Sequence, residues 1–335
     1  MPAAGAAACL PAMPLPRVAI LCPREFTFSD PAASVENGVL AGVADVRTLT
    51  LGFDEPLPAA ALDADALILW HSIPVGADVI ARLSRCRAII RNGTGYDSVD
   101  TRAAAARDIP VCNVPDYGTE EVADHALALT LALCRQLFPL DAEAKRLGWE
   151  IHVSAKMRRL RTLTFGIVGL GAIGTAAALR AKAFGFRVVF YDPYLPAGTR
   201  KALGVERADT LDELLAQADV LSVHCPLTAE TRGFIGAAQI ARLKPGSFLV
   251  NTARGDIVQK AAVFAALRSG HLAGAGLDVV ENEPLRTAEE AATPNLIVTC
   301  HAAFCSPEGM IEMRTTSARI ARAAVRGEKV WNRVN

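Results

Sequence analysis

The glycine-rich segment TFGIVGLGAIG (Thr164–Gly174) limits the possible folds of this chain more than any other feature. An apolar run leads directly into Gly169, Gly171 and Gly174, and a helical stretch continues to Phe184. In a strand–turn–helix unit, the first glycine permits a tight turn and the second lets a pyrophosphate approach the backbone. The third lets the helix pack closely on the strand. The pattern predicts the first βαβ unit of a doubly wound, dinucleotide-binding sheet.

An acidic residue lies at the distance that this motif requires. Asp192 ends the apolar run RVVFYD, where its carboxylate would accept hydrogen bonds from adenosine ribose hydroxyls. The same charge would repel a 2′-phosphate, so we expect NAD rather than NADP. The alternative is a structural turn followed by a turn-forming Asp-Pro pair. The expected phosphate contacts come from the start of the helix, at Gly171, Ala172, Ile173 and Gly174.

Short apolar runs alternate with amphipathic helical stretches in two series, and this alternation predicts an α/β protein with two parallel sheets. The length of 335 residues also favours two domains over one. We expect six strands in the second series, which would complete a Rossmann-type sheet, and a flavodoxin-like substrate domain from the first. The expected strands are Val18–Leu21, Val46–Leu49, Ala66–Trp70, Ala88–Arg91 and Val111–Asn113, then Thr164–Val168, Arg187–Tyr191, Val220–His224, Ser247–Asn251, Gly274–Val279 and Leu296–Thr299.

Two further helices set the expected domain boundaries. Thr119–Leu137 is apolar almost all round, so it should be buried, with Thr119 as its N-cap. The last helix should begin at Ser306 and Pro307 and stop at Gly327. We expect it to cross back to the first domain. The predicted substrate domain is therefore 17–118 with 302–335, and the predicted dinucleotide-binding domain is 119–301.

Composition argues against several other functions. Lys and Arg together number 35, as do Asp and Glu, so no basic excess indicates a nucleic acid or an anionic membrane. No apolar stretch reaches the roughly 18 residues of a membrane span, and the Ala- and Pro-rich first 16 residues predict a flexible leader. The eight scattered cysteines predict reduced thiols in the cytoplasm. Cys300, His301 and Cys305 lack a fourth ligand nearby, so we expect no metal.

Three polar residues follow predicted strands of the second series. Arg254 follows FLVNTA, Glu283 follows GLDVVEN and His301 follows LIVTC. Ligands of open α/β sheets bind beyond the carboxyl ends of the strands, where these side chains should converge. Arg254 could hold a carboxylate through two hydrogen bonds, His301 could donate a proton to a carbonyl oxygen, and Glu283 could orient the imidazole and stabilise its charged form. The set predicts reduction of a 2-oxo acid by NADH. The alternative is that each of the three is an ordinary surface or structural residue.

The chain from about residue 66 to 326 resembles the D-isomer-specific 2-hydroxyacid dehydrogenases. Within that family it is most similar to the C-terminal-binding proteins, NAD-binding relatives known as transcriptional co-repressors, and to their bacterial enzyme homologues. The resemblance rests on IIRNGTGYDSVD (89–100), VCNVPDYGTEEVADHAL (111–127), GIVGLGAIG (166–174), ALRAKAFGFRVVFYDPYL (178–195), HCPLTAETRGFI (224–235), FLVNTARGDIV (248–258), LDVVENEPL (277–285) and HAAF (301–304).

The resemblance implies a homodimer of two-domain subunits with a cleft between the domains. It implies catalytic roles for Arg254, Glu283 and His301, and substrate contacts from His71, Arg91 and Phe304. The cofactor contacts that it implies beyond the glycine-rich loop and Asp192 are Thr94, Thr119, Cys225, Pro226, Thr228, Thr231, Thr252, Ala253, Asp278 and His301, with Asp278 near the nicotinamide amide.

The chain departs from its relatives at two places. Phe304 stands where the C-terminal-binding proteins carry Trp, which predicts room for medium or bulky apolar 2-oxo acids. Gln259 and Lys260 stand where many relatives have Asp-Glu, and we interpret them as a surface change away from the chemistry. The rival hypothesis for the function is a dinucleotide-sensing scaffold, which would share the fold without catalysing the reaction.

Overall fold

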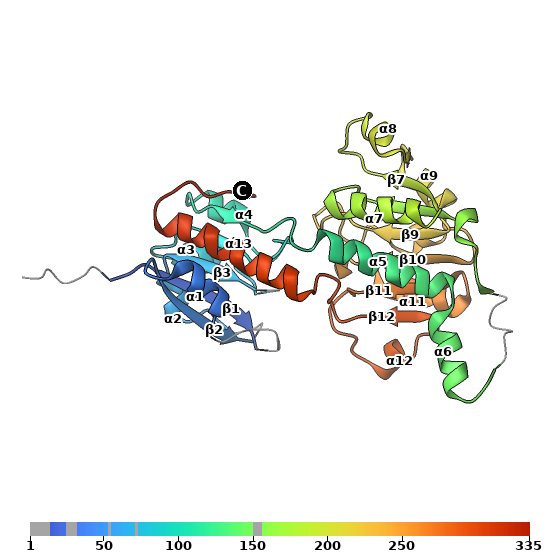
Figure 1. The fold of residues 1–335 in the computed structure, drawn as a ribbon, viewed down its shortest axis with the longest axis horizontal. Coiled ribbons are helices and arrows are strands. Elements are labelled where there is room, and N and C mark those ends of the chain that lie inside the picture. Colours follow the sequence, from blue (N-terminus) through green and yellow to red (C-terminus); the bar gives the residue numbers. More distant parts are fainter. Residues whose placement is uncertain (1–13, 25–31, 53–54, 71–72, 150–155) are drawn as a thin grey trace, which may run out of the picture. The chain divides into compact units, whose positions relative to one another are not determined.

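The computed structural model describes residues 14–24, 32–52, 55–70, 73–149 and 156–335, so most of the predicted leader lies outside the described residues. The chain divides into two compact units. One comprises Met1–Pro115 with Met310–Asn335, and the other comprises Asp116–Gly309. Each unit contains one sheet (Figure 1). Residues 302–309, predicted above to belong to the first domain, lie in the second unit with His301.

The first unit is a five-stranded parallel sheet in the order β2-β1-β3-β4-β5. This 2-1-3-4-5 order is that of flavodoxin-like folds and confirms the expectation. All five predicted strands form. They are β1 (Arg17–Pro23), β2 (Asp45–Leu51), β3 (Ala66–Leu69), β4 (Ile89–Arg91) and β5 (Val111–Cys112), with helices α1 (Ser34–Leu40), α2 (Ala59–Leu62), α3 (Ala77–Arg82), α4 (Thr101–Ala105) and most of α13 (Pro307–Val325).

The last helix, α13, completes the first unit as predicted. Ser306 caps it by accepting a 2.9 Å hydrogen bond from the Gly309 amide, and Pro307 is its first residue. Along the helix, the Arg314 guanidinium donates to both carboxylate oxygens of Glu36 on α1, at 2.9 and 2.6 Å. Glu36 is only 1% exposed, so this ion pair lies inside the unit.

The second unit is a seven-stranded parallel sheet in the order β12-β11-β10-β9-β6-β7-β8. Counting from β6, this is the 3-2-1-4-5-6 order of dinucleotide-binding sheets with β12 added at one edge. The prediction of six strands was wrong because β8 has two residues, too few for an apolar run. The strands are β6 (Thr164–Val168), β7 (Arg187–Tyr191), β8 (Glu206–Arg207), β9 (Val220–Val223), β10 (Ser247–Asn251), β11 (Leu272–Leu277) and β12 (Leu296–Val298).

Helices cover both faces of this sheet. One apolar core joins the strands to α5 and α7, which lie side by side (Figure 1), and a second core joins them to α9, α10 and α11. Helix α5 approaches β11 closely because Gly274 and Gly276 have no side chains to oppose Leu133 and Leu129. The helices are α5 (Thr119–Cys134), α6 (Leu137–Lys145), α7 (Ala172–Ala183), α8 (Thr199–Leu203), α9 (Leu211–Gln217), α10 (Ala237–Ile240), α11 (Lys260–Ser269) and α12 (Ala288–Ala291), with 3-10 turns at Leu160–Thr162 and Gly255–Ile257.

Helix α5 differs from its prediction at both ends. Gly118 takes the N-cap position, so Thr119 is the first helical residue and its hydroxyl has no hydrogen-bond partner among the described residues. The helix ends at Cys134 because Gln136 adopts a left-handed conformation (φ 54°) and donates its side-chain amide to the carbonyl of Leu133 at 2.8 Å. The helix predicted to end at Leu137 therefore ends three residues earlier, and a second helix, α6, begins at Leu137.

Within the described residues, no helix is both long and apolar enough to cross a membrane. The same residues contain no group of three or more His, Cys, Asp or Glu side chains arranged to hold a metal ion. Their seven cysteines are all free thiols.

Candidate active site

The predicted site residues of the second unit gather at one edge of its sheet. Strands β6, β9, β10, β11 and β12 are mutually parallel, so the segments that follow them emerge on the same side. These segments begin at Gly169, His224, Thr252, Asp278 and Thr299. This is the edge at which open α/β sheets bind ligands.

Two of the three glycines in the loop after β6 lie where the backbone leaves no room for a side chain. Gly169 has φ 87°, and a Cβ there would lie 2.7 Å from the backbone of Cys225. A Cβ at Gly174 would lie 2.2 Å from the carbonyl oxygen of Gly169. Gly171, in contrast, faces open space and is exposed, beside the unpaired amides that begin α7. An anion can therefore reach the amides of Ala172 and the residues after it.

Asp192 is held against this loop. Its Oδ2 accepts a 3.0 Å hydrogen bond from the Leu170 amide, and its Oδ1 accepts one of 3.0 Å from Tyr194. Arg207 on β8 holds the same turn by donating to the carbonyls of Asp192 and Leu195 at 3.1 and 2.9 Å. Arg207 was not predicted as a site residue, because strand β8 is too short to form an apolar run.

Further predicted cofactor residues of this unit lie in the segments that follow β9 and β10. Thr231 Oγ1 donates to the Pro226 carbonyl at 2.6 Å and accepts from the Thr228 amide at 2.8 Å, so these hydroxyls shape the turn after Cys225. Thr252 is different. Its buried hydroxyl has no partner in the described part of the chain, and the neighbouring Ala253 amide donates to Asn251 at 3.0 Å.

The arrangement fits a dinucleotide. Open space at Gly171 and free amides at the start of α7 suit a pyrophosphate, and the carboxylate of Asp192 suits a ribose. The orphaned Thr252 hydroxyl, farther along the same sheet edge, offers a hydrogen bond to the remainder of the ligand.

His301 and Glu283 form a direct pair. His301 Nδ1 lies 3.0 Å from Glu283 Oε2, and their side chains are 17% and 34% exposed. The His301 backbone adopts a left-handed conformation (φ 55°) and its amide donates to the Asp278 carbonyl at 2.8 Å. Two strand ends thus bring together two of the three predicted catalytic residues.

Arg254 lies on a turn that packs against the segment leading to Glu283. A Cβ at Gly255 would be 2.1 Å from the carbonyl oxygen of Val280, so only glycine permits this approach. Arg254 is half-buried and donates to the Ala253 carbonyl at 2.8 Å. The structure therefore places all three predicted catalytic residues on neighbouring segments of one sheet edge.

A buried carboxylate supports the His301 loop. Asp278 is 2% exposed and accepts hydrogen bonds from the amides of Ala302 and Ala303 at 2.9 and 3.0 Å. Thr299 Oγ1 lies 2.5 Å from the same carboxylate and 3.0 Å from His125 Nε2. The predicted contact between Asp278 and a nicotinamide stays a prediction. Thr299 and His125 were not predicted as site residues. The sequence contained a signal for each, because Thr299 is a polar residue at the end of a strand and His125 is a histidine in an apolar helix.

Phe304 lies beside His301. Its ring centroid is 6.3 Å from that of His301 and 6.1 Å from that of Tyr117, in both cases edge to face. The other predicted substrate residues belong to the first unit. Arg91 ends β4 and is 7% exposed, and Thr94 Oγ1 donates to the Val114 carbonyl at 3.2 Å. His71 lies outside the described residues.

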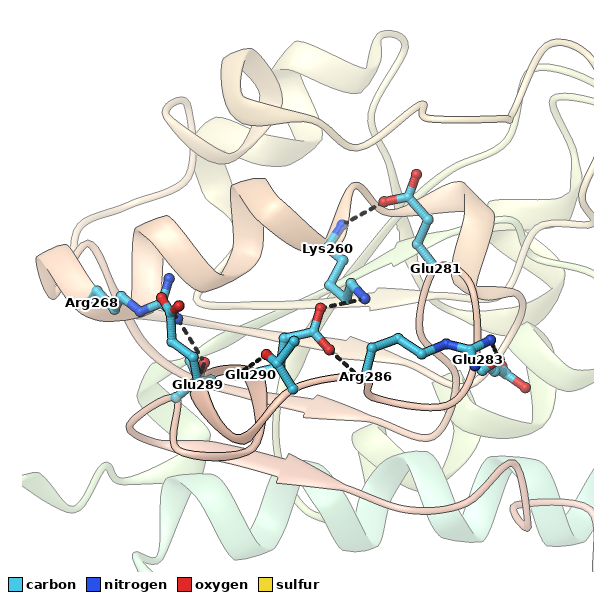
Figure 2. A network of polar contacts seen from close by, with 9 residues as sticks. Lys260, Arg268, Glu281, Glu283, Arg286, Glu289 and Glu290 are labelled. Carbon is cyan, nitrogen blue, oxygen red and sulfur yellow. Dashed lines mark hydrogen bonds and ion pairs between the residues drawn. The ribbon is translucent and has the colours of Figure 1, made fainter.

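The interpretation of Lys260 as a surface change was wrong. Its side chain is 14% exposed, and Nζ lies 2.7 Å from Glu290 Oε1. Figure 2 shows this pair within a network of polar contacts that reaches the backbone carbonyl of Glu283. Gln259 is exposed, as the sequence predicts.

The fold and the site define a dinucleotide-binding α/β protein with an acid–imidazole pair at its ligand edge. The family model described as "D-isomer specific 2-hydroxyacid dehydrogenase, NAD binding domain" matches residues 127–303. The chain belongs to this family, and its second unit contains the family's NAD-binding domain.

The relatives agree with this assignment. The chain is 39% identical over 279 residues to D-3-phosphoglycerate dehydrogenase of Mycobacterium leprae (strain TN), covering 83% of this chain and 52% of that protein. It thus spans about half the length of this curated relative. A closer likeness to the C-terminal-binding proteins is not shown and stays a prediction.

Solved structures extend the similarity over both units. The chain is similar to D-lactate dehydrogenase from Aquifex aeolicus, complexed with NAD and lactic acid, with a TM-score of 0.84 and 26% identity over 93% of this chain and 96% of that one. It is also similar to a protein from Thermus thermophilus, with a TM-score of 0.81 and 33% identity over 95% of this chain and 100% of that one.

Proposed function

We propose that the protein catalyses the reversible, NAD-dependent reduction of a small 2-oxo acid to its D-2-hydroxy acid. The observation that carries this proposal is the 3.0 Å contact between His301 Nδ1 and Glu283 Oε2. This contact lies at the same edge of the second sheet as the glycine-rich loop after β6. Family membership supports it, as does the solved relative that holds NAD and lactic acid.

Each residue of the site has a distinct role in the proposed reaction. NADH supplies the hydride that adds to the carbonyl carbon. Arg254 holds the substrate carboxylate through its planar guanidinium. His301, bound to Glu283 through Nδ1, gives a proton to the carbonyl oxygen from Nε2. Glu283 orients the ring and stabilises its charged form, as the carboxylate of a catalytic triad does.

The loop after β6 and the end of β7 would hold the cofactor. The amides of Gly171, Ala172, Ile173 and Gly174 would bind the pyrophosphate, and Asp192 would bind the adenosine ribose. The carboxylate charge of Asp192 favours NAD over NADP.

The substrate's side chain is expected to be apolar and of medium or large size. Phe304 is smaller than the Trp of the C-terminal-binding proteins, and its ring lies beside His301, where a substrate side chain would extend. We therefore expect better turnover of such 2-oxo acids than of pyruvate or glyoxylate. The names of the relatives add D-3-phosphoglycerate and D-lactate as compounds to compare.

The wider organisation of the enzyme is also a proposal. The free thiols agree with a cytoplasmic location. His71, Arg91 and Thr94, which belong to the first unit, stay predicted contacts of the substrate and the nicotinamide. Large apolar side chains exposed on α6 and just after it support a homodimer, because such side chains on a surface mark interfaces. They are Leu137, Phe138, Leu147 and Trp149.

The test is a panel of 2-oxo acids offered with NADH or NADPH, followed by the loss of nicotinamide absorbance. We expect oxidation of NADH by several acids and little activity with NADPH. Tight NADH binding without turnover of any acid would instead favour the dinucleotide-sensing scaffold, which the comparisons do not support. A clear preference for glyoxylate would contradict the role given to Phe304.

A further inference from the structure

Glu283 lies on a short exposed stretch of the loop between β11 and α12. Val280 and Leu285 pack on the core at the two ends of this stretch, whereas residues 282–284 are exposed, and Asn282 has a left-handed backbone (φ 57°). The Glu283 side chain is 34% exposed. Because residues 282–284 have little burial of their own, polar contacts help to determine where the carboxylate lies relative to His301.

Four contacts connect Lys260, at the start of α11, to this loop by two routes, one from its backbone amide and one from its side chain (Figure 2). The Lys260 amide donates to Glu281 Oε2 at 3.2 Å, and Lys260 Nζ lies 2.7 Å from Glu290 Oε1. Glu290 Oε2 in turn accepts a 2.5 Å hydrogen bond from the Arg286 amide. Arg286 then donates from Nη2 to the carbonyl oxygen of Glu283 at 2.9 Å. The loop is thus held on both sides of Glu283.

The central ion pair is more shielded than the other pair between the same two segments. Lys260 and Glu290 are 14% and 19% exposed, whereas Arg268 and Glu289, 3.2 Å apart, are 43% and 82% exposed. A shielded ion pair is screened less by water and salt than an exposed one. Lys260 and the Arg286 amide also lower the pKa of Glu290, which keeps its carboxylate charged.

We propose that Lys260 and Glu290 form a positioning pair that fixes the Glu283 loop and so aligns Glu283 with His301. The pair acts through Glu283 and touches neither substrate nor cofactor. The expected effect of this pair on turnover rests on the proposed function. The alignment of Glu283 with His301 is independent of that function.

The alignment is tested first without turnover. The imidazole N–H proton of His301 that bonds Glu283 gives a downfield NMR signal, which Glu283→Gln identifies. Lys260→Met and Glu290→Gln should each shift or broaden this signal, while Lys260→Arg should retain it. The matched control is Arg268→Met, which removes an ion pair between the same segments but has no link to Glu283. An unchanged signal in both Lys260→Met and Glu290→Gln, or an equal change in Arg268→Met, would overturn the proposal.

Turnover is the second measurement. Lys260→Met should lower kcat roughly tenfold, because misplacing a catalytic group slows the chemical step. The KM of the 2-oxo acid and the Kd of NADH should stay within about twofold, because Glu283 acts on proton transfer rather than on binding. Lys260→Arg should restore kcat. If wild type binds NADH and reduces no 2-oxo acid, the proposed function fails. The NMR result still shows whether Lys260 and Glu290 align Glu283 with His301. If wild type is active and Lys260→Met keeps full kcat, the positioning proposal fails.

Discussion

Arg254 is proposed to bind the substrate carboxylate through its planar guanidinium, which no other side chain provides. Lys at this position keeps the charge but loses the planar fork that matches a carboxylate. Losing one charge-assisted hydrogen bond of about 1.5–3 kcal/mol should lower kcat/KM by roughly 10- to 100-fold for Arg254→Lys. The loss should be similar for every 2-oxo acid because all share the carboxylate. Steady-state kinetics on three acids of different size tests this, and near-normal turnover would remove Arg254 from the site.

His301 is the proposed proton donor. His301→Gln should lower kcat by about 10²–10⁴, the usual contribution of a positioned acid or base. NADH affinity should hardly change, because the imidazole is proposed to meet the substrate and not the phosphates.

The direction of the reaction gives a second check on His301. Reduction needs the charged imidazole and oxidation needs the neutral one, so the two rates should depend on pH in opposite directions in wild type. The measurement is kcat in both directions across the pH range in which the protein is folded. Parallel profiles would mean that another group carries the proton.

At the scale of elements, the turn after β10 must lie against the turn after β11. Gly255 makes this contact possible, since a Cβ there would be 2.1 Å from the Val280 carbonyl. Gly255→Ala should therefore push apart the segments that carry Arg254 and Glu283. We expect a loss of about 1–3 kcal/mol in the free energy of unfolding and a large fall in kcat.

A matched glycine tests whether this effect is local. Gly198, in the same unit, has a negative φ and nothing within 4 Å of a Cβ position. Gly198→Ala should therefore leave both the unfolding curve in urea and kcat close to wild type. Equal behaviour of the two variants would show that the contact at Val280 does not hold the site.

At the scale of the whole molecule, a partly buried histidine links folding stability to pH. His224 follows β9, its Nε2 lies 2.8 Å from Ser222 Oγ, and burial lowers its pKa to about 4. The unfolded chain binds a proton near the ordinary value of about 6.5. His224 therefore favours folding above about pH 6.5, and this contribution is lost as pH falls toward 4.

The expected loss is about 2 kcal/mol between about pH 7 and pH 5. His224→Gln should lack this dependence on pH. The free energy of unfolding of wild type should therefore fall more than that of the variant between pH 7 and pH 5. Urea titrations at the two pH values measure it. Parallel losses in the two proteins would show that His224 binds a proton as readily in the folded state as in the unfolded chain.

The sequence by itself determined the parts of this protein that depend on local pattern. Buried strands of a parallel sheet are continuous apolar runs, so the runs around Gly169, Arg254 and His301 could be recognised. The strand ends then placed Arg254, Glu283 and His301 at one edge, because parallel strands share their carboxyl side. Strand β8 had no such run, and the second sheet was therefore predicted one strand short.

Only the tertiary structure decided which side chains support those residues. Asp278 holds the His301 loop through Ala302 and Ala303, which lie more than 20 residues away in the chain. Lys260 lies 30 residues from Glu290, and nothing in the spacing of the two predicts an ion pair. Such contacts depend on how neighbouring strands bring distant loops together, and that three-dimensional proximity leaves no periodic signal in the sequence.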